Sequence, residues 1–400
     1  MELDFISDNS IIYVLIAWVI IVLVAKGLKL DKRGFEIKPY SLTYKNYQVQ
    51  SALTKMLNRT RRGVRIFADV SVVAGFLMMG FAFWFLLSNV SNFFVKPTEF
   101  AQLTVLIPGV TLTSSTAIAY FLLSIPIVLV IHEGAHGIVA TLEKIKIKTG
   151  GFAIFIAMFA GFVEPDEEEF NKAKRISKLR VIGAGATSNV IFSFALGAVL
   201  LTNPVFAIIV PEPLLSWFYE SPEGVLVLSI IQGSGAEKAG LQPNDIITAI
   251  NDVSVITPLD FQKIEMTPGE TVTVTVLREE KELQFPVIVT PSPDDPERGL
   301  IGIMRDNSFA YKPLYNVIEW NNPQLSMFLL WLWMISFFIG IINMLPLPIL
   351  DGGKFIHSII EKRISEKSVN GFMWGIYAFT FALFGLNIAL SYIKSGWFTI

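Results

Sequence analysis

The sequence predicts a mainly α-helical membrane protein, a polytopic bundle of about six spans with a β-rich domain inserted on the extracytoplasmic side. Of its 400 residues, 52% are hydrophobic and 16% are charged, whereas a soluble domain carries about 25% charged residues. Six apolar segments approach the length of about 20 residues that a membrane span needs. One connection, residues 222–305, instead contains alternating apolar and polar residues, a pattern typical of β-strands.

The six predicted spans are runs of apolar residues with few charges, and they cover residues 11–27, 66–90, 117–141, 181–201, 325–344 and 372–393. The first run follows acidic residues and lacks a small-residue cleavage site, so we interpret it as an uncleaved span rather than a signal peptide. Lys and Arg gather in the first, third and fifth connections. The positive-inside rule therefore predicts that both termini are extracytoplasmic.

Residues 150–163 are apolar but too short to span a bilayer. Glycines at the start and near the end, with β-branched and aromatic residues between them, predict a re-entrant hairpin. Such backbone is tolerated at membrane depth only where protein covers it or where it lines a cavity. An interfacial helix is the alternative.

Residues 222–305 differ in character from the rest of the chain. Residues 224–231, 245–251 and 271–277 are expected to be strands, and residues 233–241 to form a loop that opens a short helix. The loop, the Ala-Gly-Leu step that follows it and the next strand resemble a PDZ domain. PDZ domains bind extended peptides at a sheet edge, so the resemblance implies a peptide ligand or, alternatively, a steric gate.

A candidate zinc motif lies near the inner end of the third predicted span, where an apolar run is followed by His132-Glu-Gly-Ala-His136. Positions four apart share a helix face, so both imidazoles can bind one Zn²⁺. Glu133 can then act as general base toward a zinc-bound water, whose pKa falls to about 7. Ionisable groups within an apolar span are costly and functional by default. Two histidines that only form hydrogen bonds are the alternative.

A catalytic zinc takes a third protein ligand and keeps an open position. The chain has no Cys and three His, so the remaining candidates are few. Asp351 follows a segment that starts at Asn343 and whose two prolines are expected to break the fifth helix. The third and fifth spans run in the same direction, which brings His132 and Asp351 to similar depth. We therefore predict Asp351 as the third ligand, and His357 as a partly exposed helix residue.

These motifs, HExxH in one span and Asn-x-x-Pro-x-Pro-x-Leu-Asp-Gly in a later one, resemble the site-2 protease family of intramembrane metalloproteases. The resemblance covers residues from about 117 to 360. It implies Zn²⁺ on His132, His136 and Asp351, with Glu133 as the base.

The same resemblance implies roles for two asparagines. Asn189 would contact the oxyanion or the substrate, although Ala186 stands where the family commonly has a proline. Asn343 would contact the unwound substrate. A helix-packing hydrogen bond for Asn189, and capping of the helix break for Asn343, are the alternatives.

Four regions are expected on this basis. Residues 1–115 hold the N-terminal transmembrane helices and a basic cytoplasmic loop, and residues 116–205 the first part of a catalytic membrane core with the hairpin. Residues 222–305 form the PDZ-like domain. Residues 322–400 hold the second part of the core and the last transmembrane helix.

The expected function is that of a zinc-dependent intramembrane endopeptidase that cleaves transmembrane segments of single-span membrane proteins, as in regulated intramembrane proteolysis. We expect a multi-pass protein of the cell membrane with an extracytoplasmic PDZ-like domain and an active site toward the cytoplasm. Its partners would be the bilayer, transmembrane substrates and a peptide ligand. The net charge of −2 gives no indication of nucleic acid binding.

Two other classes of function compete with this hypothesis. A metal-ion transporter also places polar residues on broken helices within the bilayer. A non-catalytic membrane scaffold with a PDZ module would have no need of Glu133. The position of Glu133 beside the first ligand favours hydrolysis.

Overall fold

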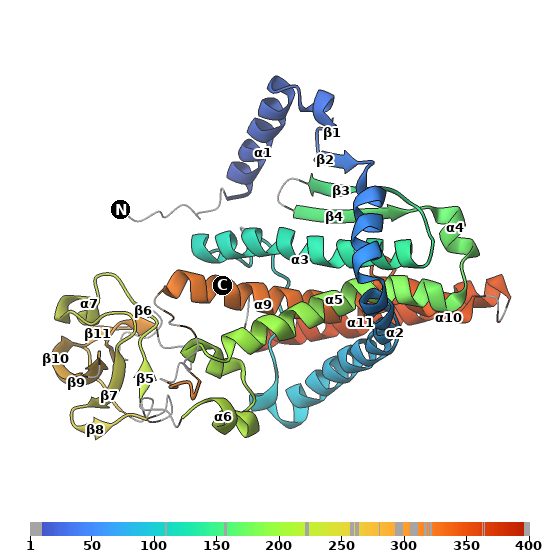
Figure 1. Cartoon of the computed structure of the whole chain (residues 1–400). Helices are drawn as coiled ribbons and strands as arrows, with labels where there is room; N and C mark the ends of the chain where they lie inside the picture. Colours follow the sequence, from blue (N-terminus) through green and yellow to red (C-terminus); the bar gives the residue numbers. More distant parts are fainter. Residues whose placement is uncertain are drawn as a thin grey trace. The chain divides into compact units, whose positions relative to one another are not determined.

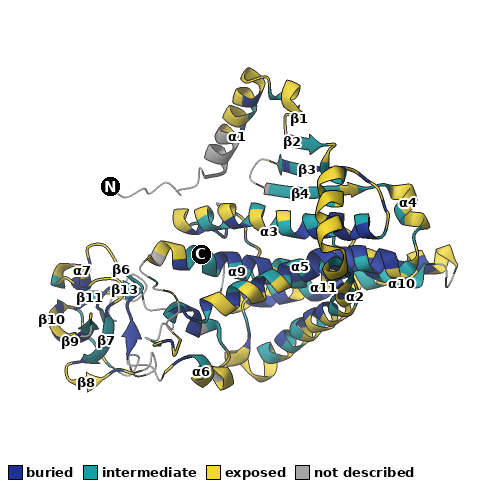
Figure 2. Ribbon diagram, viewed as in Figure 1, coloured by how far each residue is buried: buried dark blue, intermediate teal, exposed yellow. Residues whose placement is uncertain are grey.

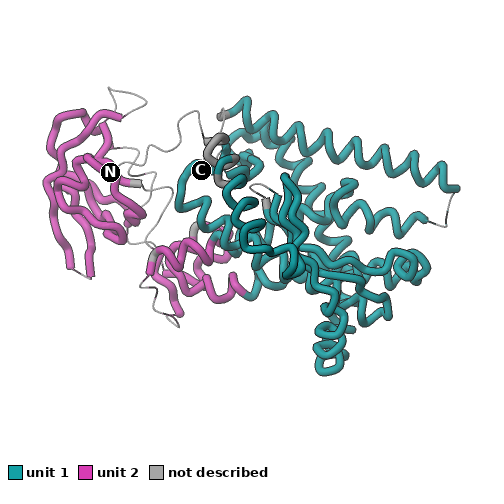
Figure 3. Tube along the Cα trace, turned by 90° about the horizontal axis from the view of Figure 1, so that it is seen from above, with its two compact units in different colours: residues 1–195, 331–400 teal, residues 196–330 magenta. Residues whose placement is uncertain are grey.

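The fold is taken from a computed structural model of the whole chain, which describes residues 10–108, 110–155, 158–220, 224–256, 260, 264–279, 281–292, 299–304, 311–315, 318, 320, 322–361, 363 and 365–395. These residues form two compact units (Figure 3), Met1–Ala195 with Trp331–Ile400, and Leu196–Leu330. The acidic residues that precede the first predicted span lie outside the described residues, as does the tip of the predicted hairpin, residues 156–157.

Five helices in the described part of the chain are long and apolar enough to cross a membrane. They are α2 (Val49–Val95), α3 (Ser115–Leu142), α5 (Arg175–Leu200), α9 (Pro323–Asn343) and α11 (Glu366–Ser395). They correspond to the second to sixth predicted spans. The first predicted span corresponds to α1 (Ser10–Gly27), where the apolar stretch found, Trp18–Gly27, is shorter. Five of the six predicted spans therefore have a helix of sufficient length, and the first predicted span stays a prediction.

Helix α2 is much longer than the span predicted at residues 66–90, because it includes 47 residues and begins at Val49. The basic residues before the apolar run are good helix formers, and no proline stops the helix. At about 1.5 Å per residue the helix is about 70 Å long, against about 30 Å for the hydrocarbon core of a bilayer. Part of the predicted basic loop is therefore a continuation of this helix.

The hairpin predicted at residues 150–163 is a β-hairpin, so the interfacial helix is excluded. Its strands β3 (Ile147–Phe155) and β4 (Met158–Pro165) are antiparallel. The sheet continues with β2 (Ser41–Asn46) and β1 (Phe35–Lys38) in the order β1-β2-β3-β4. The two added strands lie in the connection that was expected to be only a basic loop.

Strand β4 packs closely along α3 (Figure 1). A Cβ atom at Gly161 of β4 would lie 3.2 Å from Cγ of Glu133 and 3.3 Å from Cβ of Leu129. One turn further along α3, a Cβ at Gly137 would lie 3.3 Å from Cγ1 of Val163. Glycines on both elements therefore let the strand approach the helix that carries the candidate zinc motif.

Helix α5 lies at the centre of the first unit. In its most apolar window 56% of the residues are buried, against 28% for α2 and 22% for α3, and Figure 2 shows this burial along the ribbon. Small residues allow neighbouring helices to approach. A Cβ at Gly183, for example, would lie 2.5 Å from the backbone oxygen of Ser71 on α2.

The predicted break after the fifth span is confirmed. Helix α9 ends at Asn343, and the short helix α10 (Asp351–Ile360) begins at Asp351. The turn between them folds back tightly on α10, because a Cβ at Gly352 would lie 2.2 Å from the backbone oxygen of Met344. On α10 the side chain of Phe355 is fully buried and contacts α2 near Gly75. The break thus directs Asp351 into the helical core.

The second unit contains the β-rich region. Its main sheet has the order β10-β9-β7-β5, formed by residues 281–288, 271–278, 246–250 and 225–226 in that order. Its core is formed by buried valines and isoleucines from several strands. The short helix and the strands predicted at residues 245–251 and 271–277 are found at residues 235–239, 246–250 and 271–278. The strand predicted at residues 224–231 is instead two short strands, residues 225–226 and 229–230, which pair in different sheets. Strand β10 was not predicted, because it contains a proline and exposes most of its side chains.

The elements of this unit are η3 (Pro204–Ile209), α6 (Glu212–Phe218), β5 (Val225–Leu226), β6 (Ser229–Ile230), α7 (Gly235–Ala239), β7 (Ile246–Ile250), β8 (Val253–Ser254), β9 (Thr271–Arg278), β10 (Lys281–Ile288), β11 (Thr290–Pro291), β12 (Gly299–Leu300) and β13 (Ile303–Met304). Short elements of the first unit are η1 (Leu30–Arg33), η2 (Pro97–Glu99) and α4 (Glu167–Lys172).

Candidate metal centre

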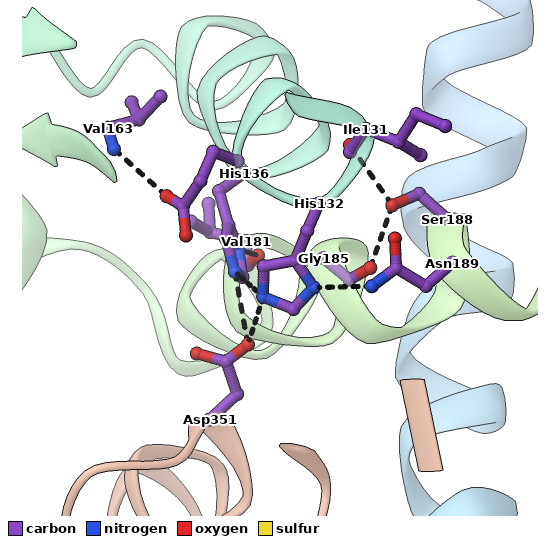
Figure 4. Close-up of polar contacts among 10 residues, drawn as sticks. Ile131, His132, His136, Val163, Val181, Gly185, Ser188, Asn189 and Asp351 are labelled. Carbon is purple, nitrogen blue, oxygen red and sulfur yellow. Dashed lines mark hydrogen bonds and ion pairs between the residues drawn. The ribbon is translucent and has the colours of Figure 1, made fainter. Parts of the chain in front are cut away.

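The two histidines of the predicted zinc motif lie on one face of α3 (Figure 4). Their Nε2 atoms are 3.1 Å apart, and the ring planes are close to perpendicular, at 83°. His132 is buried, and the side chain of His136 is 15% exposed. The helical spacing therefore points both Nε2 atoms to one place.

Asp351, the predicted third ligand, reaches the same place from α10. Its Oδ2 atom lies 3.1 Å from Nε2 of His132 and 3.1 Å from Nε2 of His136. Asp351 is the first residue of α10, and its side chain is 11% exposed. The structure thus brings together all three predicted ligands, from two helices that are far apart in the sequence.

The three donor atoms fit one zinc ion. Zinc binds imidazole nitrogen and carboxylate oxygen at about 2.0–2.2 Å, which separates tetrahedral donors by about 3.3–3.6 Å. The observed separations are each 3.1 Å. A buried set of two neutral imidazoles and one carboxylate is also a donor set that zinc prefers.

Gly185 on α5 leaves room beside these donors. A Cβ at this position would lie 2.3 Å from Nε2 of His136 and 2.7 Å from Nε2 of His132. Any larger residue would therefore push against the two nitrogens that face the candidate metal position. Gly185 was not among the residues predicted from the sequence.

A backbone carbonyl orients His136. Its Nδ1 atom lies 2.7 Å from the carbonyl oxygen of Val181 on α5. Since a carbonyl only accepts, Nδ1 carries the proton, and Nε2 keeps its lone pair for a metal. Hydrogen bonds of this kind commonly orient histidine ligands of zinc.

Glu133, the predicted general base, lies between α3 and the hairpin. It is half-buried, and its Oε2 accepts a hydrogen bond of 2.9 Å from the backbone N–H of Val163 on β4. The base is therefore held by the strand that packs along its helix. Every residue except proline has a backbone N–H group, so the sequence could not predict that Val163 donates to Glu133.

The other residues considered in the sequence analysis are Asn189, Asn343 and His357, and each has a different environment. Asn189 is completely buried on α5, with its side-chain amide against His132. Asn343 is the last residue of α9 and half-buried, and its role stays a prediction. His357 has a side chain that is 47% exposed, as expected, and lies 3.9 Å from Glu361.

Comparisons with known proteins match most of the chain to a single family. The sequence profile of peptidase family M50 matches residues 120–384. An uncharacterized protein of Methanocaldococcus jannaschii is 24% identical over 356 residues, which are 86% of this chain and 84% of that protein. A putative zinc metalloprotease of Agrobacterium fabrum is 24% identical over 253 residues, which are 50% of this chain and 63% of that protein.

A third relative is the membrane-bound transcription factor site-2 protease homolog of Arabidopsis thaliana. It is 28% identical over 156 residues, which are 38% of this chain and 28% of that protein. The chain therefore spans most of the Methanocaldococcus jannaschii relative, and less than two thirds of the Agrobacterium fabrum and Arabidopsis thaliana relatives.

Shorter matches concern about one fifth of the chain. The PDZ domain of the SdrC-like protein of Listeria monocytogenes is 25% identical, with a TM-score of 0.19, over 20% of this chain and 86% of that domain. A probable periplasmic serine endoprotease, DegP-like, of Chlamydia trachomatis is 38% identical over 78 residues, which are 19% of this chain and 16% of that protein.

Proposed function

The chain belongs to peptidase family M50, and from this premise we propose that it is a zinc-dependent endopeptidase that cleaves transmembrane segments of single-span membrane proteins. Membership of this family supports the predicted metalloendopeptidase, and the apolar helices support a multi-pass membrane protein. The observation that carries the proposal is the convergence of His132, His136 and Asp351 next to Glu133.

The proposed chemistry assigns a role to each of these side chains. Zn²⁺ held by His132, His136 and Asp351 would supply a Lewis acid and a water of lowered pKa. A carboxylate oxygen of Glu133 takes a proton from the attacking water and delivers it to the leaving amide nitrogen. The low polarity around the buried ligands strengthens these electrostatic interactions.

The substrate segment must be extended where it is cut. A peptide carbonyl inside an intact helix is held in an internal hydrogen bond, so a transmembrane substrate has to unwind locally before it can react. We propose that the unwound segment pairs with β4, the last strand in the order of the described sheet. Pairing would add a strand to this edge, next to the helix that carries Glu133.

The proposed topology follows from the distribution of Lys and Arg. The basic connections would lie in the cytoplasm, with both termini and the PDZ-like domain outside. In this orientation His132 lies toward the cytoplasmic end of its span and Asp351 follows the cytoplasmic end of the fifth span, so the cytoplasmic product of cleavage could leave the membrane. The PDZ-like domain would bind a peptide or admit substrates according to the size of their extracytoplasmic part.

A reconstitution experiment tests the proposed function. Purified protein is placed in lipid vesicles with a single-span substrate, and the wild type is compared with Glu133→Gln for cleavage and for bound zinc. We expect about one zinc per chain in both proteins, and cleavage that is lower by a factor of about 10²–10⁴ in the variant.

The other outcomes separate the competing functions. Equal cleavage by both proteins would exclude Glu133 as the base. Uptake of zinc into the vesicles without cleavage would favour the metal-ion transporter. A protein that neither cleaves nor retains zinc, but binds the substrate, would favour the PDZ scaffold.

A further inference from the structure

The side chain of Asn189 has an unusual environment for a buried amide. It is 0% exposed, and its Nδ2 atom lies 3.2 Å from Nδ1 of His132 (Figure 4). Its Oδ1 atom is buried without a hydrogen-bond partner among the residues described. An unsatisfied buried oxygen costs about 1–3 kcal/mol, and the oxygen and nitrogen of an Asn amide are assigned from such contacts.

This orientation of the amide conflicts with metal binding by His132. If Nδ2 donates to Nδ1, then Nδ1 is unprotonated, and the neutral ring carries its proton on Nε2. Nε2 is the atom that lies 3.1 Å from the corresponding atom of His136 and 3.1 Å from Oδ2 of Asp351. A protonated Nε2 offers no lone pair to a zinc ion at this position.

A half-turn of the amide group removes the conflict. The oxygen and nitrogen of an Asn side chain have nearly the same shape, so either atom can occupy either position. After the exchange Oδ1 accepts the hydrogen of Nδ1 in His132, and Nε2 is left with its lone pair. His136 already has this arrangement, because its Nδ1 donates to the carbonyl of Val181.

We propose that Asn189 is a positioning residue that accepts the Nδ1–H of His132 through Oδ1 and so keeps Nε2 free to bind Zn²⁺. This inference rests on the proposed metal centre. It gives Asn189 a role different from a contact with the substrate and from simple helix packing. The amide NH₂ group then takes the position that Oδ1 occupies in the structure.

The backbone of Asn189 is well placed for such a role. The hydroxyl of Ser336 on α9 donates a hydrogen bond of 2.9 Å to the carbonyl oxygen of Asn189. Gly340, one turn further on α9, allows close contact, because a Cβ there would lie 2.7 Å from Cγ2 of Val190. The residue is therefore fixed between α3 and α9, and its side chain has little freedom to move away from His132.

Substitutions at Asn189 test the proposal through zinc affinity. Asn189→Ala removes the acceptor, and Asn189→Asp keeps an acceptor but removes the NH₂ group. Ser193→Ala is the matched control, because Ser193 is also buried on α5 and its hydroxyl donates only to the carbonyl of Val190 within the same helix. Affinity is measured by competition with a chelator on purified full-length protein.

We expect Asn189→Ala to bind zinc about 10–100-fold more weakly than the wild type, the usual effect of losing the group that orients a histidine ligand. Asn189→Asp and Ser193→Ala should bind zinc with an affinity close to that of the wild type. Substrate cleavage at saturating zinc provides a second measurement on the same proteins.

The protonation of the ring is measured directly by ¹⁵N-histidine NMR. The chain has three histidines, so few signals have to be assigned. In the zinc-loaded wild type and in Asn189→Asp, His132 should have a protonated Nδ1 and a zinc-bound Nε2. In Asn189→Ala the Nδ1–H signal of His132 should exchange faster with water.

Two results would overturn the proposal. One is an Asn189→Ala protein with the zinc affinity and the histidine spectrum of the wild type. The other is an Asn189→Asp protein that loses zinc binding, which would make the NH₂ group the essential part; this variant decides the matter if Asn189→Ala does not fold. A wild type that binds no zinc would instead contradict the proposed metal centre itself.

Discussion

The two halves of the proposed metal centre are built in different ways. Helix α3 supplies His132 and His136 from one continuous helix, so the geometry of the helix sets their spacing. Asp351 comes 215 residues after His136 in the sequence, and its position depends on the break before α10 and on the packing of that helix. The α3 half is thus fixed locally, whereas the α10 half is fixed by tertiary structure. Substitutions outside the site should therefore disturb the second half more than the first.

The largest effect is expected at Gly185 on α5, which lies against both histidines of the α3 half. Gly185→Ala would place a methyl group within 2.3 Å of His136 Nε2, and a ligand set tolerates displacements of only about 0.5 Å. We expect loss of measurable zinc binding and of cleavage while the protein remains folded. Gly134→Ala is the control within the zinc motif, because a Cβ there meets nothing within 4 Å. Zinc binding by Gly185→Ala at the wild-type level would contradict the assigned position of the metal.

The second-largest effect is expected at an ion pair at the C-terminal end of α10. Nζ of Lys178 on α5 lies 2.6 Å from Oε1 of Glu361, and their side chains are 3% and 20% exposed. Lys178→Met would leave the carboxylate without this partner and lower the free energy of unfolding by about 3 kcal/mol. Thermal unfolding in detergent measures the loss. The double variant with Glu361→Gln should recover part of it, and an unchanged midpoint in the single variant would show that the pair does not hold α10.

A smaller effect is expected in the turn that leads to Asp351. Gly352→Ala would place a Cβ 2.2 Å from the backbone oxygen of Met344, so the turn must shift at a cost of about 1–3 kcal/mol. Because this turn carries Asp351, zinc affinity should fall together with stability. Gly371→Ala on α11, where a Cβ meets nothing within 4 Å, should be neutral or stabilising by about 0.5–1 kcal/mol. Equal behaviour of the two variants would mean that the α10 half is less dependent on packing than proposed.

The smallest effect is expected beside the α3 half, at the base of the hairpin. Asp166 accepts a hydrogen bond from the backbone N–H of Glu169, which, with the nearby Lys148, holds the pKa of this carboxyl below its ordinary value. The ionised Asp166 carboxylate therefore contributes fully to stability above the pKa of an unfolded Asp. This contribution is lost as the pH falls through the lowered pKa of Asp166 in the folded state.

Hydrogen exchange at the Glu169 amide measures this contact. At neutral pH, Asp166→Ala should raise the exchange rate of that amide, corrected for the intrinsic rate, and the zinc affinity should stay unchanged. Faster exchange throughout α3 in this variant would show that the hairpin base and the metal-binding helix are coupled, against the local character assigned to this half.

The same contrast explains how much of the site could be predicted from the sequence. His132, Glu133 and His136 follow from a spacing within one helix, and Asp351 from the shared direction of two spans. The closeness of the three ligands agrees with both predictions. The space at Gly185 and the amide of Asn189 facing His132 could not be predicted, because they depend on how α5 packs against α3.

The fold shows a similar division. Apolar length predicted the membrane helices, the two prolines after the fifth span predicted the helix break, and the glycines with the residues between them predicted the hairpin at residues 150–163. The strands β1 and β2 were missed, because they are short and lie in a basic connection, and they join the sheet through the pairing of β2 with β3. The extension of α2 to Val49 was also missed, because the edge of an apolar run marks the membrane boundary and not the end of a helix.

The central claim is that one zinc ion is shared between α3 and α10. X-ray absorption at the zinc edge, on purified wild-type protein and on Asp351→Asn, tests it most directly. We expect two imidazole nitrogens and at least one carboxylate oxygen around zinc in the wild type, at about 2.0–2.2 Å, and loss of zinc or of the carboxylate oxygen in the variant. A zinc environment that is the same in both proteins would contradict the claim.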